Sequence, residues 1–515
     1  MMRLCDILCC VVLLLSGCGG GSSSDRSVTD LGRTDSLLHI SAELKRIPGP
    51  GLDAVLVSCS LSMDGQPVLS EPEIQADRGS LGFLEAVAPG KWEVVLTPAG
   101  TGLHSITMRS GDVNKTVHPI VCEQLSDDWG QARLVEGLVN SQGYEDGAHI
   151  SKDGEWLFVH YGPVYMSGIL SHFGDIDHPL NTNAIGPYAA PLRPGFYDTR
   201  IVDGTIEHYS TLLPELGQMF LPPTMFYGFH RQADSSFAEP FPIGINDAEG
   251  ASSNAFGICL VPGTDNPIVV FALEHYFDKD EYGVDLDTSH DIYSSPLTLG
   301  QVNELANWKR GTESSMEIIE DAKGMQVLNL PEQVLGQGNP MVSQNNAGTY
   351  ALWTDAEYLP AGGADSWNNE QYFENISVHE LSGDWATGSW SLSILPEPIN
   401  GSDSHERQPF FTGTQLYFAR DDATMPVTIM SSDYLGGPFE MSTSWSEPTV
   451  EISAGTGRFE AGSLLAVGEP TIATRTGGDE MYFIAVLSRG TIGNDDDLDL
   501  DGQVAMVPRL PIANE

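Results

Sequence analysis

The chain has 515 residues and carries 71 Asp and Glu against 24 Lys and Arg, a formal net charge of −47 at pH 7. A field of this sign repels nucleic acid and anionic lipid headgroups, so the composition argues against a nucleic-acid-binding protein. The length predicts two or three domains, and the 41% hydrophobic content is sufficient for large cores.

The N-terminus has the order of a secretory signal. Arg3 is followed by an apolar stretch from Ile7 to Leu15 and then by small residues. This stretch is too short to cross a bilayer, which takes about 20 residues. The closing residues Leu15-Ser16-Gly17-Cys18 resemble the lipobox of bacterial lipoproteins.

That resemblance implies removal of residues 1–17 and lipidation of Cys18, with palmitate among the acyl chains. The protein would then be membrane-anchored at the cell envelope. The residue after the cysteine is Gly19 rather than Asp, which by the same resemblance favours the outer membrane. Residues 18–35 are rich in Gly and Ser and predict a flexible tether.

Residues 36–122 read as short strands. Residues 54–61 are apolar and β-rich, Asp64-Gly65 is a hairpin signal, and a Pro-Gly turn precedes the strand at 91–96. They predict a small β-sandwich, and Pro89-Gly90-Lys91-Trp92 resembles a strand of bacterial immunoglobulin-like domains. Because exported proteins retain disulfides, Cys59 and Cys122 are expected to pair. Cys259 is expected to be a buried small hydrophobe.

Residues 123–144 are interpreted as a linker with a short helix near 129–138. A weak repeat follows over 145–510: a polar segment with Glu, a short strand, a Gly/Asp turn and an aromatic strand. Its clear copies begin at Glu145, Glu406 and Glu469, and a degenerate copy begins at Gly338. One such unit cannot bury both faces alone, so the repeat predicts a closed ring of blades.

The predicted fold is therefore all-β, a sandwich followed by a five- or six-bladed β-propeller, with six blades favoured. Residues 150–158 resemble the TolB-type, WD40-like propellers of bacterial envelope proteins, with Lys152 where proline is usual. Residues 165–240 are hard to assign to a blade. Two insertions, near 278–290 and 359–373, are candidate binding loops by position alone.

A possible calcium site lies near the C-terminus. Asp497, Asp499 and Asp501 alternate before Gly502, as at the start of a calcium loop, but the twelfth position is Pro508. The alternative is a solvated acidic turn. Two weaker metal candidates are the acidic loop Asp278–Asp287 and the histidine-rich segment His172–His178.

The repeated glutamates Glu145, Glu406 and Glu469 are candidates for the channel mouth. Paired carboxylates there can do acid–base work or hold a cation. The favoured interpretation is structural, with each glutamate bonding the backbone of a neighbouring blade. No nucleophile elbow, phosphate-binding loop or zinc-protease motif is found in the sequence.

These observations predict an envelope lipoprotein whose propeller binds a protein or glycan partner without catalysis. The alternative is a carbohydrate-active enzyme, a glycoside hydrolase or lyase using channel-mouth carboxylates. A third class is a purely structural envelope component.

Overall fold

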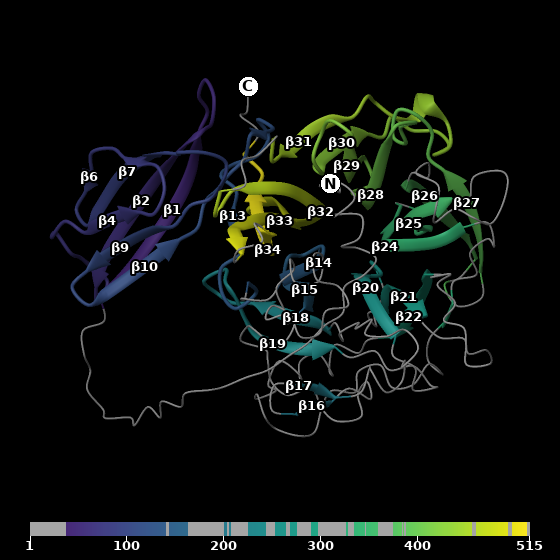
Figure 1. Ribbon diagram of the computed structural model, residues 1–515, viewed down its shortest axis with the longest axis horizontal. Helices are drawn as coiled ribbons and strands as arrows, with labels where there is room; N and C mark the ends of the chain where they lie inside the picture. Colours follow the sequence, from purple (N-terminus) through teal and green to yellow (C-terminus); the bar gives the residue numbers. More distant parts are fainter. Residues whose placement is uncertain are drawn as a thin grey trace.

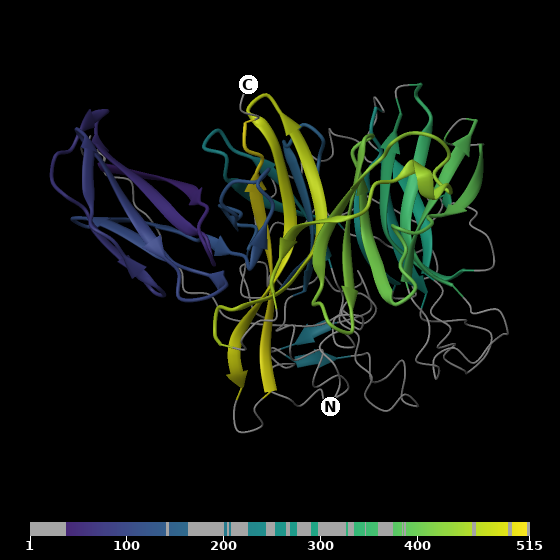
Figure 2. The same cartoon turned by 90° about the horizontal axis from the view of Figure 1, so that it is seen from above.

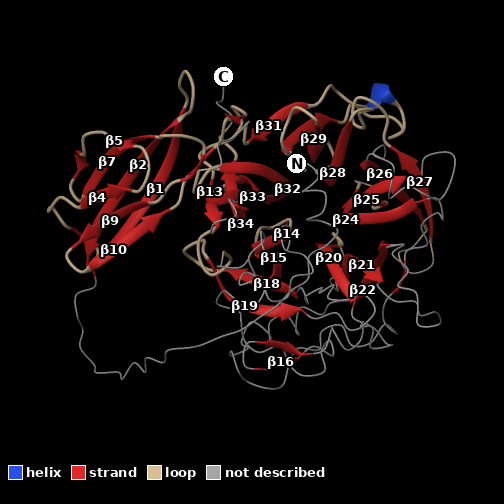
Figure 3. Ribbon diagram, viewed as in Figure 1, coloured by secondary structure: helices blue, strands red, loops and turns tan. Residues whose placement is uncertain are grey.

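The computed structural model describes the sandwich from Leu38 onward and the propeller with gaps. A sandwich lies to one side of a ring of sheets (Figure 1). Apart from one short 3₁₀ turn, Ser442–Ser444, the regular elements described are strands (Figure 3). The all-β prediction is confirmed. The described residues are 38–140, 144–162, 200–202, 205–207, 225–243, 253–263, 268–275, 290–296, 326–327, 334–345, 347–358, 374–383, 385, 388–455, 460–492 and 497–511.

The sandwich consists of two facing antiparallel sheets. Along β2 the buried side chains alternate, which is the pattern of a strand with one face on a core. Val55, Val57 and Trp92 are among the residues that fill the space between the sheets. The first sheet is β1 (Leu38–Ile47), β2 (Ala54–Met63), β3 (Gln66–Pro67), β5 (Ser80–Leu81), β6 (Glu85–Ala88) and β7 (Lys91–Thr97); the second is β4 (Glu73–Ala76), β9 (Ile106–Ser110) and β10 (Val113–Val117).

The predicted disulfide is wrong, because both cysteines are free thiols. Cys59 faces the sandwich core, whereas Cys122 packs in a propeller core with Trp129 and Ile452. Two thiols in separate cores cannot reach the Cβ spacing that a disulfide requires. Burial raises the pKa of Cys59 to about 11 and that of Cys122 to about 12, so neither is a reactive thiolate at neutral pH. Cys259 is also free and buried.

In the described residues the propeller consists of five sheets, four with four strands and one with five. Their first strands contact one another in sequence, and β32 returns to contact β14, so the ring closes with five blades. The preference for six blades is therefore wrong. The blades are β14 (Tyr144–Ile150), β15 (Trp156–Gly162), β18 (Met225–Arg231), β19 (Phe237–Ile243); β20 (Ser253–Leu260), β21 (Ile268–His275), β22 (His290–Pro296), β23 (Gln326–Val327); β24 (Val334–Gln344), β25 (Tyr350–Tyr358), β26 (Glu374–Ser382), β27 (Ser389–Ile394); β28 (Ser404–Phe411), β29 (Gln415–Asp422), β30 (Thr428–Asp433), β31 (Thr449–Ser453); and β32 (Leu464–Arg475), β33 (Gly478–Ile492), β34 (Asp497–Pro508) with β13 (Arg133–Leu134).

Residues 165–240, the segment that is hard to assign from the sequence, belong to blade 1. Their described part holds the small hairpin β16 (Arg200–Val202) and β17 (Thr205–Glu207), then β18 and the start of β19. In the view from above, β33 and β34 extend beyond the strands of the neighbouring blades (Figure 2).

The expected helical linker is instead a set of edge strands. β13 pairs with β34 as the outer strand of blade 5, and β12 (Gln124–Leu125) adds a strand to β31 of blade 4. β11 (Ile120–Val121) pairs with β8 (Gly102–Leu103). Trp129 is fully buried, and its indole Nε1 donates to Glu451 Oε2 at 2.6 Å. Pairing and burial together cover two sheet edges that would otherwise expose unpaired backbone groups.

Every innermost strand has a β-bulge at the same height. The register of each inner strand shifts against its partner at this point. The first bulged residue has a positive φ, between 44° and 61°, and the next residue is Ala, Ile or Pro. The five positive-φ residues are Gly147, Gly257, Asn339, Gln408 and Glu469.

Replacing Arg46 should loosen the junction between the sandwich and the propeller. Its guanidinium donates to the carbonyls of Leu125, Ser126 and Trp129 at 2.8 to 3.2 Å. Arg46→Ala should lower the free energy of unfolding by about 2–4 kcal/mol, because three carbonyls lose a charged donor. Chemical denaturation measures this loss, and Lys45→Ala, an exposed neighbour, is the control. Equal stability of the two variants would contradict the assignment.

Candidate functional site

Hydrogen bonds from the bulges connect blades 3, 4, 5 and 1 around the propeller axis. Asp355 accepts from Asn339 Nδ2 at 2.7 Å and from the Gln408 backbone N–H at 2.9 Å, which joins blade 3 to blade 4. Gln408 Nε2 donates to Glu469 at 3.1 Å and its Oε1 accepts from the Glu469 N–H at 2.9 Å. The Glu469 carboxylate accepts from the Gly147 N–H, which joins blade 5 to blade 1. We call these five residues the axial clasp.

The structure does not bring the three repeated glutamates together at a channel mouth. Glu469 occupies a bulge, whereas Glu145 and Glu406 lie two residues before the equivalent bulge positions. Glu145 is buried and accepts from Gln503 Nε2 at 3.2 Å. Glu406 is buried and forms an ion pair with Arg420 at 2.8 Å. Glu469 bonds the backbone of a neighbouring blade, at Gly147.

Glu469 forms a carboxyl pair with Asp146, and Asp146 is the titratable residue that the sequence interpretation missed. Burial raises the pKa of Asp146 to about 6. Burial and the neighbouring Asp146 charge raise the pKa of Glu469 well above its ordinary value. The two side chains are hydrogen-bonded and both pKa values are raised, so the pair keeps a proton to higher pH than two exposed carboxyl groups and can exchange it. Only the Asp-Gly at 146–147, before a strand, signalled this position in the sequence.

The pocket on the axis is too small for a sugar. It has a volume of about 40 Å³ and is lined by the bulge residues and the side chains just below them, including Met341, Phe410 and Thr471. Small-molecule sites usually measure about 300–1,000 Å³. The bulges therefore constrict the centre of the ring.

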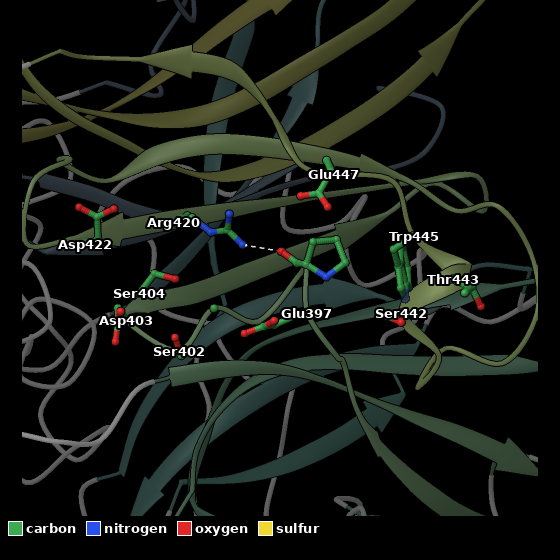
Figure 4. Close-up of a pocket in the computed structure, with 12 residues that line it drawn as sticks. Glu397, Ser402, Asp403, Ser404, Arg420, Asp422, Ser442, Thr443, Trp445 and Glu447 are labelled. Atoms are coloured by element: carbon green, nitrogen blue, oxygen red, sulfur yellow. Dashed lines mark hydrogen bonds between the residues drawn. The ribbon is translucent and has the colours of Figure 1, made fainter.

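A larger groove lies on blade 4, beneath the connection from blade 3 (Figure 4). Its volume is about 670 Å³, which is within the range of ligand sites. Carboxylates and hydroxyls dominate its walls, with one guanidinium and one indole. The lining residues are Glu397, Pro398, Gly401, Ser402, Asp403, Ser404, Arg420, Asp422, Ser442, Thr443, Trp445 and Glu447.

Two groups in this groove are held rigidly. Arg420 Nη2 donates to the Pro398 carbonyl at 3.0 Å, the contact drawn in Figure 4, while its Nε donates to buried Glu406. Trp445 is 4% exposed, and its Nε1 donates to the Phe439 carbonyl at 2.9 Å.

The predicted calcium loop is not formed. Asp497, Asp499 and Asp501 lie in β34, which pairs with β33. In an extended strand, alternate residues are about 7 Å apart, so their carboxylates do not wrap around one ion. Asp501 instead pairs with Arg489 at 2.6 Å and accepts from Gln503. Within the part of the chain that is described, no group of three His, Cys, Asp or Glu is arranged to hold a metal.

The remaining candidates fall outside the described residues. They are His172–His178, the acidic loop Asp278–Asp287 and nearly all of the two insertions; His290, at the end of the first insertion, begins β22. Among the described residues, no helix is long and apolar enough to span a membrane.

No family model and no curated protein matches this chain. Several solved structures align with this chain at low similarity, and some of them are named as carbohydrate enzymes. The α-L-arabinofuranosidase from Lactobacillus brevis aligns at 12% identity over 54% of this chain and 86% of that one, with a TM-score of 0.33. The GH93 α-L-arabinofuranosidase of Fusarium graminearum in complex with arabinobiose aligns at 9% identity over 88% and 89%, with a TM-score of 0.31. The intramolecular trans-sialidase from Ruminococcus gnavus aligns at 8% identity over 87% and 91%, with a TM-score of 0.27. Likeness of this degree carries no argument about the ligand.

The Asp146–Glu469 pair should make stability depend on pH. Both folded pKa values are raised, so the folded chain binds more protons than the unfolded chain between pH 4 and 6. Stability should therefore fall as the pH rises through this window, by about 2–3 kcal/mol for Asp146. Glu469→Gln keeps a hydrogen bond to Asp146 but cannot ionise, so its melting temperature should vary less with pH than that of the wild type. The control is Glu440→Gln, an exposed carboxylate, and a wild-type curve parallel to that of Glu469→Gln would contradict the coupling.

Proposed function

We propose that this protein is an envelope lipoprotein whose propeller binds a carbohydrate in the groove on blade 4. The groove itself carries the proposal, because it combines a ligand-sized volume with the polar groups that bind sugar hydroxyls. Carboxylates such as Asp403 and Glu447 accept hydrogen bonds from hydroxyls, and the Arg420 guanidinium donates to them. Ser402 and Thr443 can do either.

Rigid walls favour this binding. Arg420 is fixed by Glu406 and by two backbone carbonyls, those of Pro398 and Ile399. Trp445 is fixed by its bond to Phe439 and by packing against Trp353, with ring centroids 6.3 Å apart. Side chains that are already ordered lose less conformational entropy when a ligand binds.

A second candidate function is hydrolysis of a glycosidic bond presented at the open end of the axial pocket, which is itself too small to enclose a sugar. The observation that favours it is the raised pKa of Asp146, about 6, beside Glu469. Glycosidases use two carboxyl groups about 5–10 Å apart, farther than a hydrogen-bonded pair. In this candidate, Asp146 exchanges the proton, burial raises its pKa, and the second catalytic carboxylate comes from elsewhere in the chain.

The binding proposal is tested by a glycan array followed by titration of the best ligand. Asp403 and Glu447 are exposed residues on opposite walls of the groove. The double variant Asp403→Ala/Glu447→Ala should bind at least about tenfold more weakly, because each charged hydrogen bond contributes about 1.5–3 kcal/mol. Glu440→Ala, an exposed carboxylate on the same connection that does not line the groove, is the control. Failure of the wild type to retain any glycan, or equal affinity of all variants, would exclude the proposal.

Hydrolysis is tested by release of reducing sugar from the retained glycans. Asp146→Asn should lower the rate by about 10²–10⁴-fold, the usual contribution of a general acid or base, without weakening binding in the groove. Asp153→Asn, in an exposed turn of the same blade, is the control. If the wild type binds glycans but releases no sugar, the non-catalytic function stands and the second candidate is excluded.

The lipid anchor is tested on the mature N-terminal peptide. Intact mass should show acylated Cys18 as the first residue, and Cys18→Ser should move the protein from the membrane to the soluble fraction. A mature chain that begins elsewhere without lipid would sink this part of the proposal.

A further inference from the structure

The far edge of the sandwich exposes a row of large apolar side chains. Phe83 is 94% exposed, Leu69 74% and Val87 49%. Phe83 lies between β5 and β6, which together line the outer side of β7, and Val87 lies at a bulge in β6. Leu69 follows β3. Pro67 of β3 lies against Gly90, at the turn between β6 and β7, so closely that a side chain added at Gly90 would clash with it. We call Leu69, Phe83 and Val87 the apolar edge.

This edge points away from the propeller. In Figure 1, β6 and β7 lie on the side of the sandwich farthest from the ring. The sandwich cannot fold back to cover the edge, because Arg46 holds the opposite side of the domain to residues 125–129. Exposed apolar clusters on soluble domains commonly mark contacts with a partner or a membrane.

The charge distribution indicates whether the apolar edge contacts a partner or a membrane. Residues 38–121 contain nine acidic and six basic residues, a net charge of −3, whereas residues 122–515 carry 58 acidic and 15 basic residues, a net charge of −43. An anionic bilayer surface repels the propeller strongly and the sandwich hardly at all. Exposed Lys91 also pairs in register with Ala88, at the end of the apolar edge.

The position of the sandwich in the chain also supports contact between the apolar edge and a membrane. Residues 19–37 separate Cys18 from the first described strand, and if the predicted tether behaves as a Gly/Ser-rich linker of this length, it spans about 25 Å on average. The sandwich is therefore the folded unit nearest the lipid. The geometry points to the apolar edge as a membrane-contacting surface, with Phe83 and Leu69 in the headgroup region of the bilayer to which Cys18 is attached. This inference rests on the proposed lipid anchor, but its test separates the two.

The test uses the full lipidated chain on vesicles of phosphatidylethanolamine with a minor fraction of phosphatidylglycerol. Phe83→Cys and Leu435→Cys each carry an environment-sensitive fluorophore; Leu435 is 65% exposed on blade 4 and serves as the matched control. Cys59, Cys122 and Cys259 are buried, so the label reaches only the introduced thiol. Emission at position 83 should shift to the blue and be quenched by spin-labelled acyl chains, whereas position 435 should behave as in water. Aqueous emission at both positions would overturn the inference.

A second arm removes the lipid. In a Cys18→Ser chain, Phe83→Ser/Leu69→Ser should reduce residual vesicle binding by about tenfold or more, and Leu435→Ser should leave it unchanged. Equal binding of the two variants would overturn the inference even if Cys18 is lipidated in the wild type. Conversely, loss of binding confined to the edge variant would support it even if Cys18 carries no lipid.

Discussion

Closure of the ring at its axis is the constraint on which the rest of the structure depends. Five strands meet there, and each makes a bulge whose first residue has a positive φ. Asn339, Gln408 and Glu469 adopt this conformation at a cost of about 1–2 kcal/mol each. The Gln408 and Glu469 side chains offset that cost by hydrogen-bonding the next blade, and the Asn339 side chain by hydrogen-bonding Asp355 of its own blade. The same bulge brings the Asp146 carboxyl against Glu469, so closure of the ring and the raised pKa values of the pair have one origin.

A second constraint is the scarcity of cations, with 24 Lys and Arg for 71 Asp and Glu. Several arginines neutralise carboxylates inside the propeller, as Arg420 does for Glu406 and Arg231 for Glu480. Arg407 likewise pairs with Glu374 and, at 3.1 Å, with Asp421. Loss of one partner would leave a buried charge unpaired, typically a cost of about 3–5 kcal/mol. In the groove this arrangement fixes Arg420, while the Asp403 and Glu447 side chains are exposed.

Local patterns predicted the strands well but not their long-range partners. Alternation along β2 and the Asp153-Gly154 turn are properties of neighbouring residues, and the structure has both. Residues 129–138 suggested a helix because nothing local shows that β13 pairs with β34, more than 360 residues away. The blade number failed because an insertion between β15 and β18 interrupts blade 1. The disulfide failed because the sequence does not show that two domains have separate cores.

The site was harder to predict because its patterns have two meanings. Alternate aspartates at 497–501 suit a calcium loop, but they equally suit one face of a strand, which is what forms. In the sequence repeat, Glu469 aligns with Glu145 and Glu406. In the structure, Glu469 is itself the positive-φ residue of its bulge, whereas Glu145 and Glu406 lie two residues before theirs. The groove is assembled from three separate segments, so no single stretch of sequence predicts it.

The most direct test of the carbohydrate proposal is a crystal structure of the mature chain with its tightest-binding oligosaccharide. The account predicts sugar density between residues 397–403 and 442–447, in contact with Arg420; density elsewhere on the propeller with this groove empty would contradict it.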